Sequence, residues 1–161
     1  MSLSFAAIFS DHCVLQRNKN LTIFGYGDCP DGTALKVPLK NSAGSVLSEN
    51  SGRIYKGRWD IQLGPQSAQT GCSLTVEGDG AITLSDIAIG EVWLAGGQSN
   101  MEFELQNCTE GPEEMADTAG NGGAKNVRFY YTNKIGWMDD HFYEAERNTC
   151  WQTWESQARG A

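Results

Sequence analysis

Apolar and polar residues alternate through the first half of the chain, a pattern typical of strands with one buried face. The alternating apolar positions between residues 20 and 86 are Leu21, Ile23, Leu35, Val37, Leu39, Trp59, Ile61, Leu63, Leu74, Val76, Ile82 and Leu84. Turn-forming sequences separate these runs at residues 29–32, 41–44, 50–52 and 78–80. Short strands at this spacing predict an antiparallel β-sandwich or jelly roll over residues 1–86.

The hydrophobic pattern changes after Asp86. Residues 87–95 form an almost continuous apolar run, interrupted only by Glu91, and such a run predicts a strand that is buried on both faces. A break of two glycines, Gly96 and Gly97, follows the run. We therefore expect a second domain that covers residues 87–161.

Helical and extended patterns follow the glycine break. Three apolar residues fall at helical spacing: Met101, Leu105 and Cys108. A further helix is predicted over residues 111–120, with Pro112 at its first position and two acids in its first turn. Residues 127–131 are β-branched and aromatic, as in a strand. Together these segments predict one strand–helix–strand unit, the first part of a doubly wound α/β sheet.

The composition argues against two classes of partner. Twelve basic and 20 acidic residues give a net charge of −8, and no basic run interleaved with aromatic residues is present, so we expect no binding to nucleic acid. The apolar stretches are far shorter than the roughly 20 residues that cross a bilayer, so we expect no membrane span.

The first residues lack the features of a secretory signal, which favours a cytoplasmic protein, or a secreted or lysosomal one whose signal has been removed. The five cysteines contain no C-x-x-C pair, which favours free thiols and no metal site.

The candidate chemistry lies at Gly97-Gln98-Ser99-Asn100-Met101. A strand, a tight glycine turn, a serine and a helix together expose a hydroxyl above a parallel sheet, with the serine N–H directed at a developing oxyanion. The sequence is not the G-x-S-x-G elbow, because residue 101 is Met. The pattern alone leaves open a polar loop without chemistry.

Longer blocks around this turn carry a family resemblance. They are GEVWLAGGQSNME at residues 90–102, FSDHCVLQR at 9–17, FGYG at 24–27, NVRFY at 126–130, and the tryptophans Trp151 and Trp154. The chain resembles the sialate O-acetylesterases and their carbohydrate-esterase relatives in the SGNH hydrolase superfamily. The likeness covers nearly the whole chain. It departs from many relatives at Ala95-Gly96, where they carry Cys-Ser.

The resemblance implies an esterase that hydrolyses acetyl esters on sugars through a serine acetyl-enzyme. Ser99 would be the nucleophile and a backbone oxyanion donor, with Gln98 and Asn100 bracing the turn. The substrate would be an O-acetylated sugar, either a sialic acid or a plant-type glycan, and no cofactor or metal would be required.

The family also uses a glycine and an asparagine as oxyanion donors, and a late Asp-x-x-His motif that supplies the base and its acid. We expect these blocks to lie beyond residue 161. The chain is therefore expected to be the N-terminal portion of such an esterase, carrying the nucleophile only and inactive alone. Its partner would be the missing C-terminal part of the domain or another subunit. A non-catalytic carbohydrate-binding or scaffold module remains the alternative.

Neither histidine is expected to be the base. His12 is predicted to lie in a strand beside Cys13, where adjacent side chains point to opposite faces. His141 follows two aspartates, but the residue three before it is Met138, so the Asp-x-x-His spacing is not met. Without a base, a serine hydroxyl is a poor nucleophile.

Three further features are not expected to form ligand sites. The acids Asp139, Asp140, Glu144 and Glu146 lack the spacing of a calcium loop and are expected to form a solvated face. Trp137, Trp151 and Trp154 are expected to pack against the sheet, although stacking on sugar rings is the alternative. Gly25-Tyr26-Gly27 lacks the third glycine of a dinucleotide site.

Overall fold

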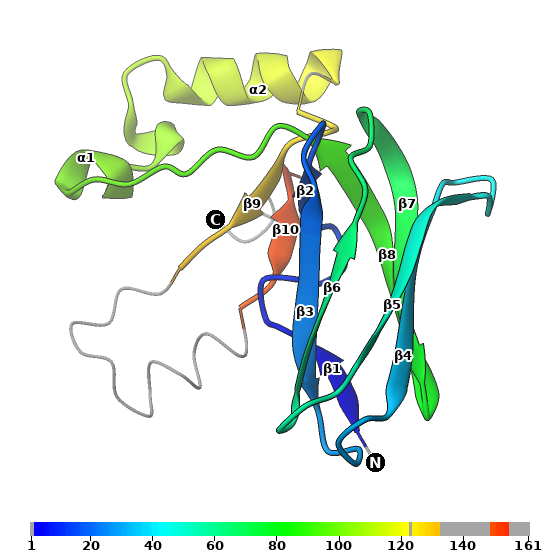
Figure 1. The fold of residues 1–161 in the computed structure, drawn as a ribbon. Coiled ribbons are helices and arrows are strands. Elements are labelled where there is room, and N and C mark those ends of the chain that lie inside the picture. Colours follow the sequence, from blue (N-terminus) through cyan, green and yellow to red (C-terminus); the bar gives the residue numbers. More distant parts are fainter. Residues whose placement is uncertain (1, 123, 133–148, 155–161) are drawn as a thin grey trace.

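The computed structural model describes residues 2–122, 124–132 and 149–154, and it consists mostly of β-strands with few helices (Figure 1). The strands are β1 (Leu3–Phe5), β2 (Val14–Gln16), β3 (Leu21–Gly27), β4 (Ala34–Lys40), β5 (Val46–Arg53), β6 (Arg58–Leu63), β7 (Gln69–Gly78), β8 (Gly80–Gly90), β9 (Arg128–Tyr130) and β10 (Trp151–Thr153). The helices are α1 (Ser99–Glu102), the short 3₁₀ helix η1 (Leu105–Asn107) and α2 (Gly111–Asn121).

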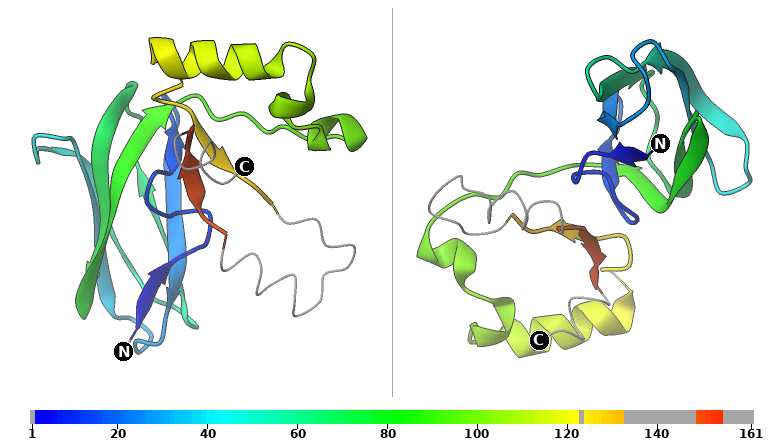
Figure 2. Two further views of the ribbon diagram at one scale, coloured as in Figure 1. Left: turned by 180° about the vertical axis from the view of Figure 1, so that it is seen from behind. Right: turned by 90° about the horizontal axis from the view of Figure 1, so that it is seen from below.

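Strands β1 to β8 form two sheets that face each other (Figures 1 and 2). One sheet has the order β1-β3-β6 and is antiparallel. The other has the order β2-β8-β7-β4-β5, in which only the β2–β8 pair is parallel. Apolar side chains from both sheets, such as Ile23 and Trp59 from one and Leu39 and Leu74 from the other, pack into one buried core. Removal of this apolar surface from water is the main force that holds the layers together.

The alternating pattern predicted this core well. Ten of its positions are buried: Leu21, Ile23, Leu35, Val37, Leu39, Trp59, Ile61, Leu63, Leu74 and Val76. Ile82 and Leu84 are only half-buried and lie at the margin of the core. The predicted turn at residues 78–80 is the tight connection between β7 and β8, with Gly80 at φ 133.

Two local predictions were wrong. The turn expected at residues 50–52 is instead part of the strand β5. β5 pairs only with β4, so β5 is an edge strand, and its side chains are mostly polar and exposed. His12 lies not in a strand but in a turn before β2, with φ 67. Left-handed backbone of this kind is unusual for a non-glycine residue and departs from the regular extended backbone of a strand.

The buried strand expected over residues 87–95 ends earlier than predicted. β8 runs through Ile87, Ala88 and Ile89, which are buried between β7 and β2, and ends at Gly90. Trp93 is 87% exposed and Leu94 is fully exposed, and both lie beyond the last residues of β8 that pair with β7 and β2. The sheet thus continues four residues past the expected domain boundary, and the division into domains at residue 86 stays a prediction.

The helical region agrees in part with the sequence. α2 has Pro112 in its first turn, Glu113 and Glu114 beside it, and a left-handed Gly122 after its last residue, so its bounds match the prediction closely. The helical spacing from Met101 to Cys108 instead yields the two short helices α1 and η1. β9 pairs in antiparallel fashion with β10, which places Trp151 opposite Tyr130. Within the described residues, no helix is long and apolar enough to cross a bilayer.

Candidate active site and its supports

Ser99 is the first residue of α1 and is exposed. It follows the irregular stretch 91–98, and α1 stands apart from the two sheets in every view of Figures 1 and 2. Among the described residues, neither its hydroxyl nor its backbone N–H has a hydrogen-bonding partner. Both groups are therefore available to a ligand from solvent.

The turn before Ser99 is held by its backbone. The carbonyl of Gln98 accepts the N–H of Met101 at 2.8 Å, while the Gln98 side chain makes no capping hydrogen bond. A Cβ atom at Gly97 would lie 2.5 Å from Cγ of Met101, so a side chain at this position would displace Met101. Asn100 is exposed within α1. The bracing roles predicted for the side chains of Gln98 and Asn100 stay predictions.

The chain leaves β8 toward Ser99 at Glu91, which is bonded to residues at the end of β2. Glu91 accepts hydrogen bonds from Gln16 Nε2 at 2.8 Å and from Arg17 Nε at 2.5 Å. Oε1 of Gln16 in turn accepts the backbone N–H of Val92 at 2.9 Å. These bonds to Gln16 and Arg17 lower the pKa of the exposed Glu91 carboxyl. The acidic interruption of the apolar run is therefore the residue that anchors the exit of the strand.

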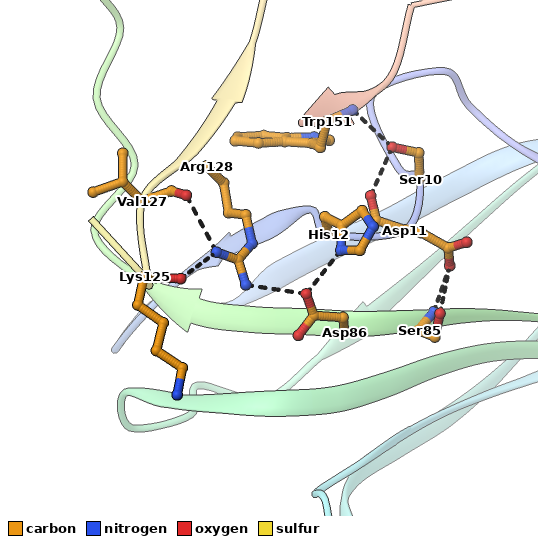
Figure 3. A network of polar contacts seen from close by, with 9 residues as sticks. All are labelled: Ser10, Asp11, His12, Ser85, Asp86, Lys125, Val127, Arg128 and Trp151. Atoms are coloured by element: carbon orange, nitrogen blue, oxygen red, sulfur yellow. Dashed lines mark hydrogen bonds and ion pairs between the residues drawn. The ribbon is translucent and has the colours of Figure 1, made fainter. Parts of the chain in front are cut away.

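Asp86 forms a second support, four residues upstream of the exit (Figure 3). Its Oδ2 accepts His12 Nδ1 at 2.7 Å and Nη2 of Arg128 at 3.0 Å. The Arg128 side chain is only 7% exposed, and its Nη1 donates to the carbonyls of Lys125 and Val127. A buried guanidinium needs a counter-charge, and Asp86 supplies it.

The charge balance of Asp86 follows from these contacts. Partial burial alone raises the pKa of its carboxyl, but the hydrogen bond from His12 and the positive charge of Arg128 outweigh burial, and the net effect is a lowered pKa. Asp86 is therefore ionised at neutral pH, and His12 donates to it through Nδ1.

A third set of contacts joins β10 to the first residues of the chain. The Trp151 backbone N–H donates to Ser10 Oγ at 2.9 Å, and its indole N–H donates to the carbonyl of Ile8 at 2.8 Å. The Trp151 ring packs on Tyr130 and against the core of the sheets. This agrees with the packing role favoured from the sequence. Trp154 lies beside Phe129, with ring centroids 6.2 Å apart; Trp137 lies outside the described residues.

The His12 side chain makes its hydrogen bond to Asp86 and none to Ser99. His12 lies at the sheet and is bonded to Asp86, whereas Ser99 lies on α1. His141 and the nearby acids Asp139, Asp140, Glu144 and Glu146 lie outside the described residues. Sequence reasoning did not predict the support formed by Asp86 and Arg128. The two residues are 42 positions apart, and Asp86 lies in none of the blocks that carry the family resemblance, so no pattern in the sequence pointed to this contact.

The resemblance blocks at residues 9–17, 90–102 and 126–130, together with Trp151, are separate in the sequence but make contacts around the last part of β8. Residues 10–17 contact residues 85–92, Arg128 contacts Asp86, and Trp151 contacts Ser10. No family model matches the chain. Sialate O-acetylesterases from Homo sapiens and Pongo abelii are each 25% identical to it over 122 residues, which make up 71% of this chain and 23% of theirs. The predicted resemblance to the sialate O-acetylesterases is confirmed.

Other comparisons agree with this relationship. The sialate O-acetylesterase of Mus musculus is 25% identical over 138 residues, 81% of this chain and 25% of its own. A carbohydrate acetylesterase from Xanthomonas citri shares the fold, with a TM-score of 0.74 and 23% identity over 95% of this chain and 32% of its own. The chain thus spans about a quarter of the length of the sialate O-acetylesterases that it matches.

Proposed function

We propose that this chain is part of a carbohydrate O-acetylesterase and that Ser99 is its nucleophile. The main support is the exposed Ser99 hydroxyl at the start of a helix, in a chain related to sialate O-acetylesterases. The substrate is an O-acetylated sugar, of the sialic acid class or a plant-type glycan.

The reaction follows from the chemistry of an acetyl ester. The Ser99 Oγ attacks the acetyl carbonyl carbon while a base takes its proton, and the Ser99 backbone N–H donates to the oxyanion that forms. Collapse of this intermediate expels the sugar hydroxyl and leaves an acetyl group on Ser99. Water, activated by the same base, then releases acetate and restores the hydroxyl.

The architecture proposed for this activity has two parts. Residues 1–86 form a β-sandwich of the jelly-roll kind, and residues 87–161 form the first β-α-β part of an SGNH-like α/β domain. Exposed apolar side chains in the second part, such as Trp93, Leu94 and Phe103, support the view that further polypeptide covers it. That polypeptide is the remainder of the esterase domain or another subunit, and it supplies the base.

The proposal predicts little activity for the 161-residue chain alone. A positioned base contributes about 10²- to 10⁴-fold to such a reaction. Among the described residues, none donates to or accepts from the Ser99 hydroxyl. The proposal therefore assigns the base to a histidine of the further polypeptide.

The test measures release of acetate from an O-acetylated sialic acid and from an acetylated plant glycan. The chain is assayed alone and mixed with a polypeptide that covers the remaining part of a related sialate O-acetylesterase. Turnover by the mixture that Ser99→Ala abolishes supports the proposal. Turnover by the chain alone that Ser99→Ala abolishes would contradict the need for a second polypeptide. Glycan binding by an inactive mixture would favour the non-catalytic carbohydrate-binding module.

A further inference from the structure

The segment that carries Ser99 is attached to the rest of the structure at its two ends. Residues 91–127 leave the five-stranded sheet after Gly90 and lead, through α1, η1 and α2, to β9, which pairs with β10 in a separate two-stranded sheet (Figure 1). α1 lies away from both sheets in all views. The contacts at these two ends therefore limit where Ser99 can lie relative to the sheets.

The outgoing end is held by Glu91 through Gln16 and Arg17. The returning end is held by Arg128. Its Nη1 binds the carbonyls of Lys125 and Val127 at 2.8 and 3.2 Å, and its Nη2 binds Asp86 at 3.0 Å. One guanidinium thus ties the chain just before β9 to the strand from which the segment departed.

Asp86 lies in a β-bulge. Cys72 and Leu74 on β7 are two residues apart, but their partners on β8, Ile87 and Leu84, are three apart, so β8 carries one extra residue there. Asp86 has φ 51, a left-handed conformation that Asp and Asn tolerate better than most residues. Bulges redirect a side chain away from the regular ladder. Here the redirected carboxylate meets both His12 and Arg128.

The cost of this arrangement argues that its main role is not stability. Arg128 is buried at its side chain, and among the described residues its Nε has no hydrogen-bonding partner. An ion pair with a buried, incompletely bonded member adds little to stability compared with an apolar contact of the same volume. Its distinctive property is the defined geometry of a planar donor group.

We propose that Asp86 and Arg128 are positioning residues that close the segment 91–127 and thereby hold Ser99 in one place relative to the sheets. This rests on the proposed role of Ser99 for its functional meaning, but the position of Ser99 is measurable without any catalysis.

The test is a distance between spin labels at Ser99→Cys and at Ser51→Cys, an exposed position on β5. The background carries Cys108→Ser and Cys150→Ser, because the other three cysteines are buried. Arg128→Ala and Asp86→Asn remove the pair, and the Asn tolerates the left-handed backbone. Arg128→Lys keeps the charge without the planar fork. Lys36→Ala is the matched control, since it removes an exposed ion pair with Glu49 on the sheets.

The parent and the Lys36→Ala control are expected to give one narrow distance distribution. Arg128→Ala and Asp86→Asn are expected to lose that single peak, and Arg128→Lys to recover part of it, while the sheets still melt cooperatively at a somewhat lower temperature. A narrow distribution in both Arg128→Ala and Asp86→Asn would overturn the proposal. If Arg128→Ala does not fold, Asp86→Asn decides alone. A broad distribution already in the parent would also overturn it, whether or not Ser99 proves to be a nucleophile.

Discussion

His12 Nδ1 donates a hydrogen bond of 2.7 Å to Asp86 Oδ2, and both residues have left-handed backbone conformations. The pair has the form of an acid that orients a histidine, but it lies at the sheet and supports the segment that leads to Ser99 rather than Ser99 itself. With Arg128 on the other side, it makes Asp86 the centre of the contacts between the sheets and β9.

Acidic pH should weaken the interactions of Asp86 with His12 and Arg128. The folded-state pKa of Asp86 is lowered, so its contribution to stability is complete above the unfolded-state value of about 3.9 and is lost as the pH falls through the folded-state value. We expect Asp86→Asn to lower the free energy of unfolding at pH 7 by about 1 kcal/mol, because the carboxyl is 39% exposed and solvent screens it.

Urea unfolding at pH 7 and at pH 2.5, about one unit or more below the unfolded-state value, checks this expectation. The difference between the parent and Asp86→Asn should shrink at the lower pH. An equal difference at both values would show that the effect of the substitution is not electrostatic.

Gly25 should not tolerate a side chain. A Cβ atom there would lie 2.0 Å from the carbonyl oxygen of Ser4 and 2.6 Å from the Trp59 ring. We expect Gly25→Ala to destabilise the sheets by about 1–3 kcal/mol through overpacking. Gly64→Ala is the matched control, because its Cβ would meet nothing closer than 3.8 Å. Thermal melts of both variants measure the effect, and equal melting temperatures would refute it.

The cysteines should differ sharply in reactivity. Burial raises the pKa of the Cys13 thiol to about 12, and burial also raises that of Cys72. Iodoacetamide at pH 8 should therefore label the exposed Cys150 in the native protein and leave Cys13 and Cys72 unlabelled, because the thiolate is the reactive form. Peptide mass spectrometry reads the sites, with urea-unfolded protein as the control in which all five react. Native labelling of Cys13 at the rate of Cys150 would contradict the burial.

The core between the sheets should respond to loss of volume. Leu74 is completely buried, and we expect Leu74→Ala to cost about 2–5 kcal/mol in the free energy of unfolding. Val46 is 50% exposed on the edge strand β5, so Val46→Ala should change it by less than about 0.5 kcal/mol. Urea denaturation compares the two. Similar losses would mean that the core does not lie between these sheets.

The core was predictable because each central strand carries its own alternating pattern. The alternation of Leu35, Val37 and Leu39 predicts a half-buried strand without reference to any other part of the chain, and all three residues are buried. β5 was missed because an edge strand needs only backbone pairing with β4, and its polar side chains resemble a turn.

The supports of the site were not predictable in the same way. The apolar run after Asp86 indicated a long buried strand, but the strand ends where its neighbours end, and only the fold shows where that is. His12 was placed in a strand because nothing local signals its left-handed turn. Arg128 reaches Asp86 across 42 residues, a contact that no local period encodes.

The proposed function requires that Ser99 attacks an acetyl ester when a base is supplied. The most direct measurement mixes the chain with the remaining part of a related sialate O-acetylesterase, adds an aryl acetate, quenches in acid and locates the acetyl group by peptide mass spectrometry. We expect acetyl on Ser99, only in the mixture, and none in Ser99→Ala. Acetylation of another residue in the mixture, with undiminished ester hydrolysis by Ser99→Ala, would contradict it.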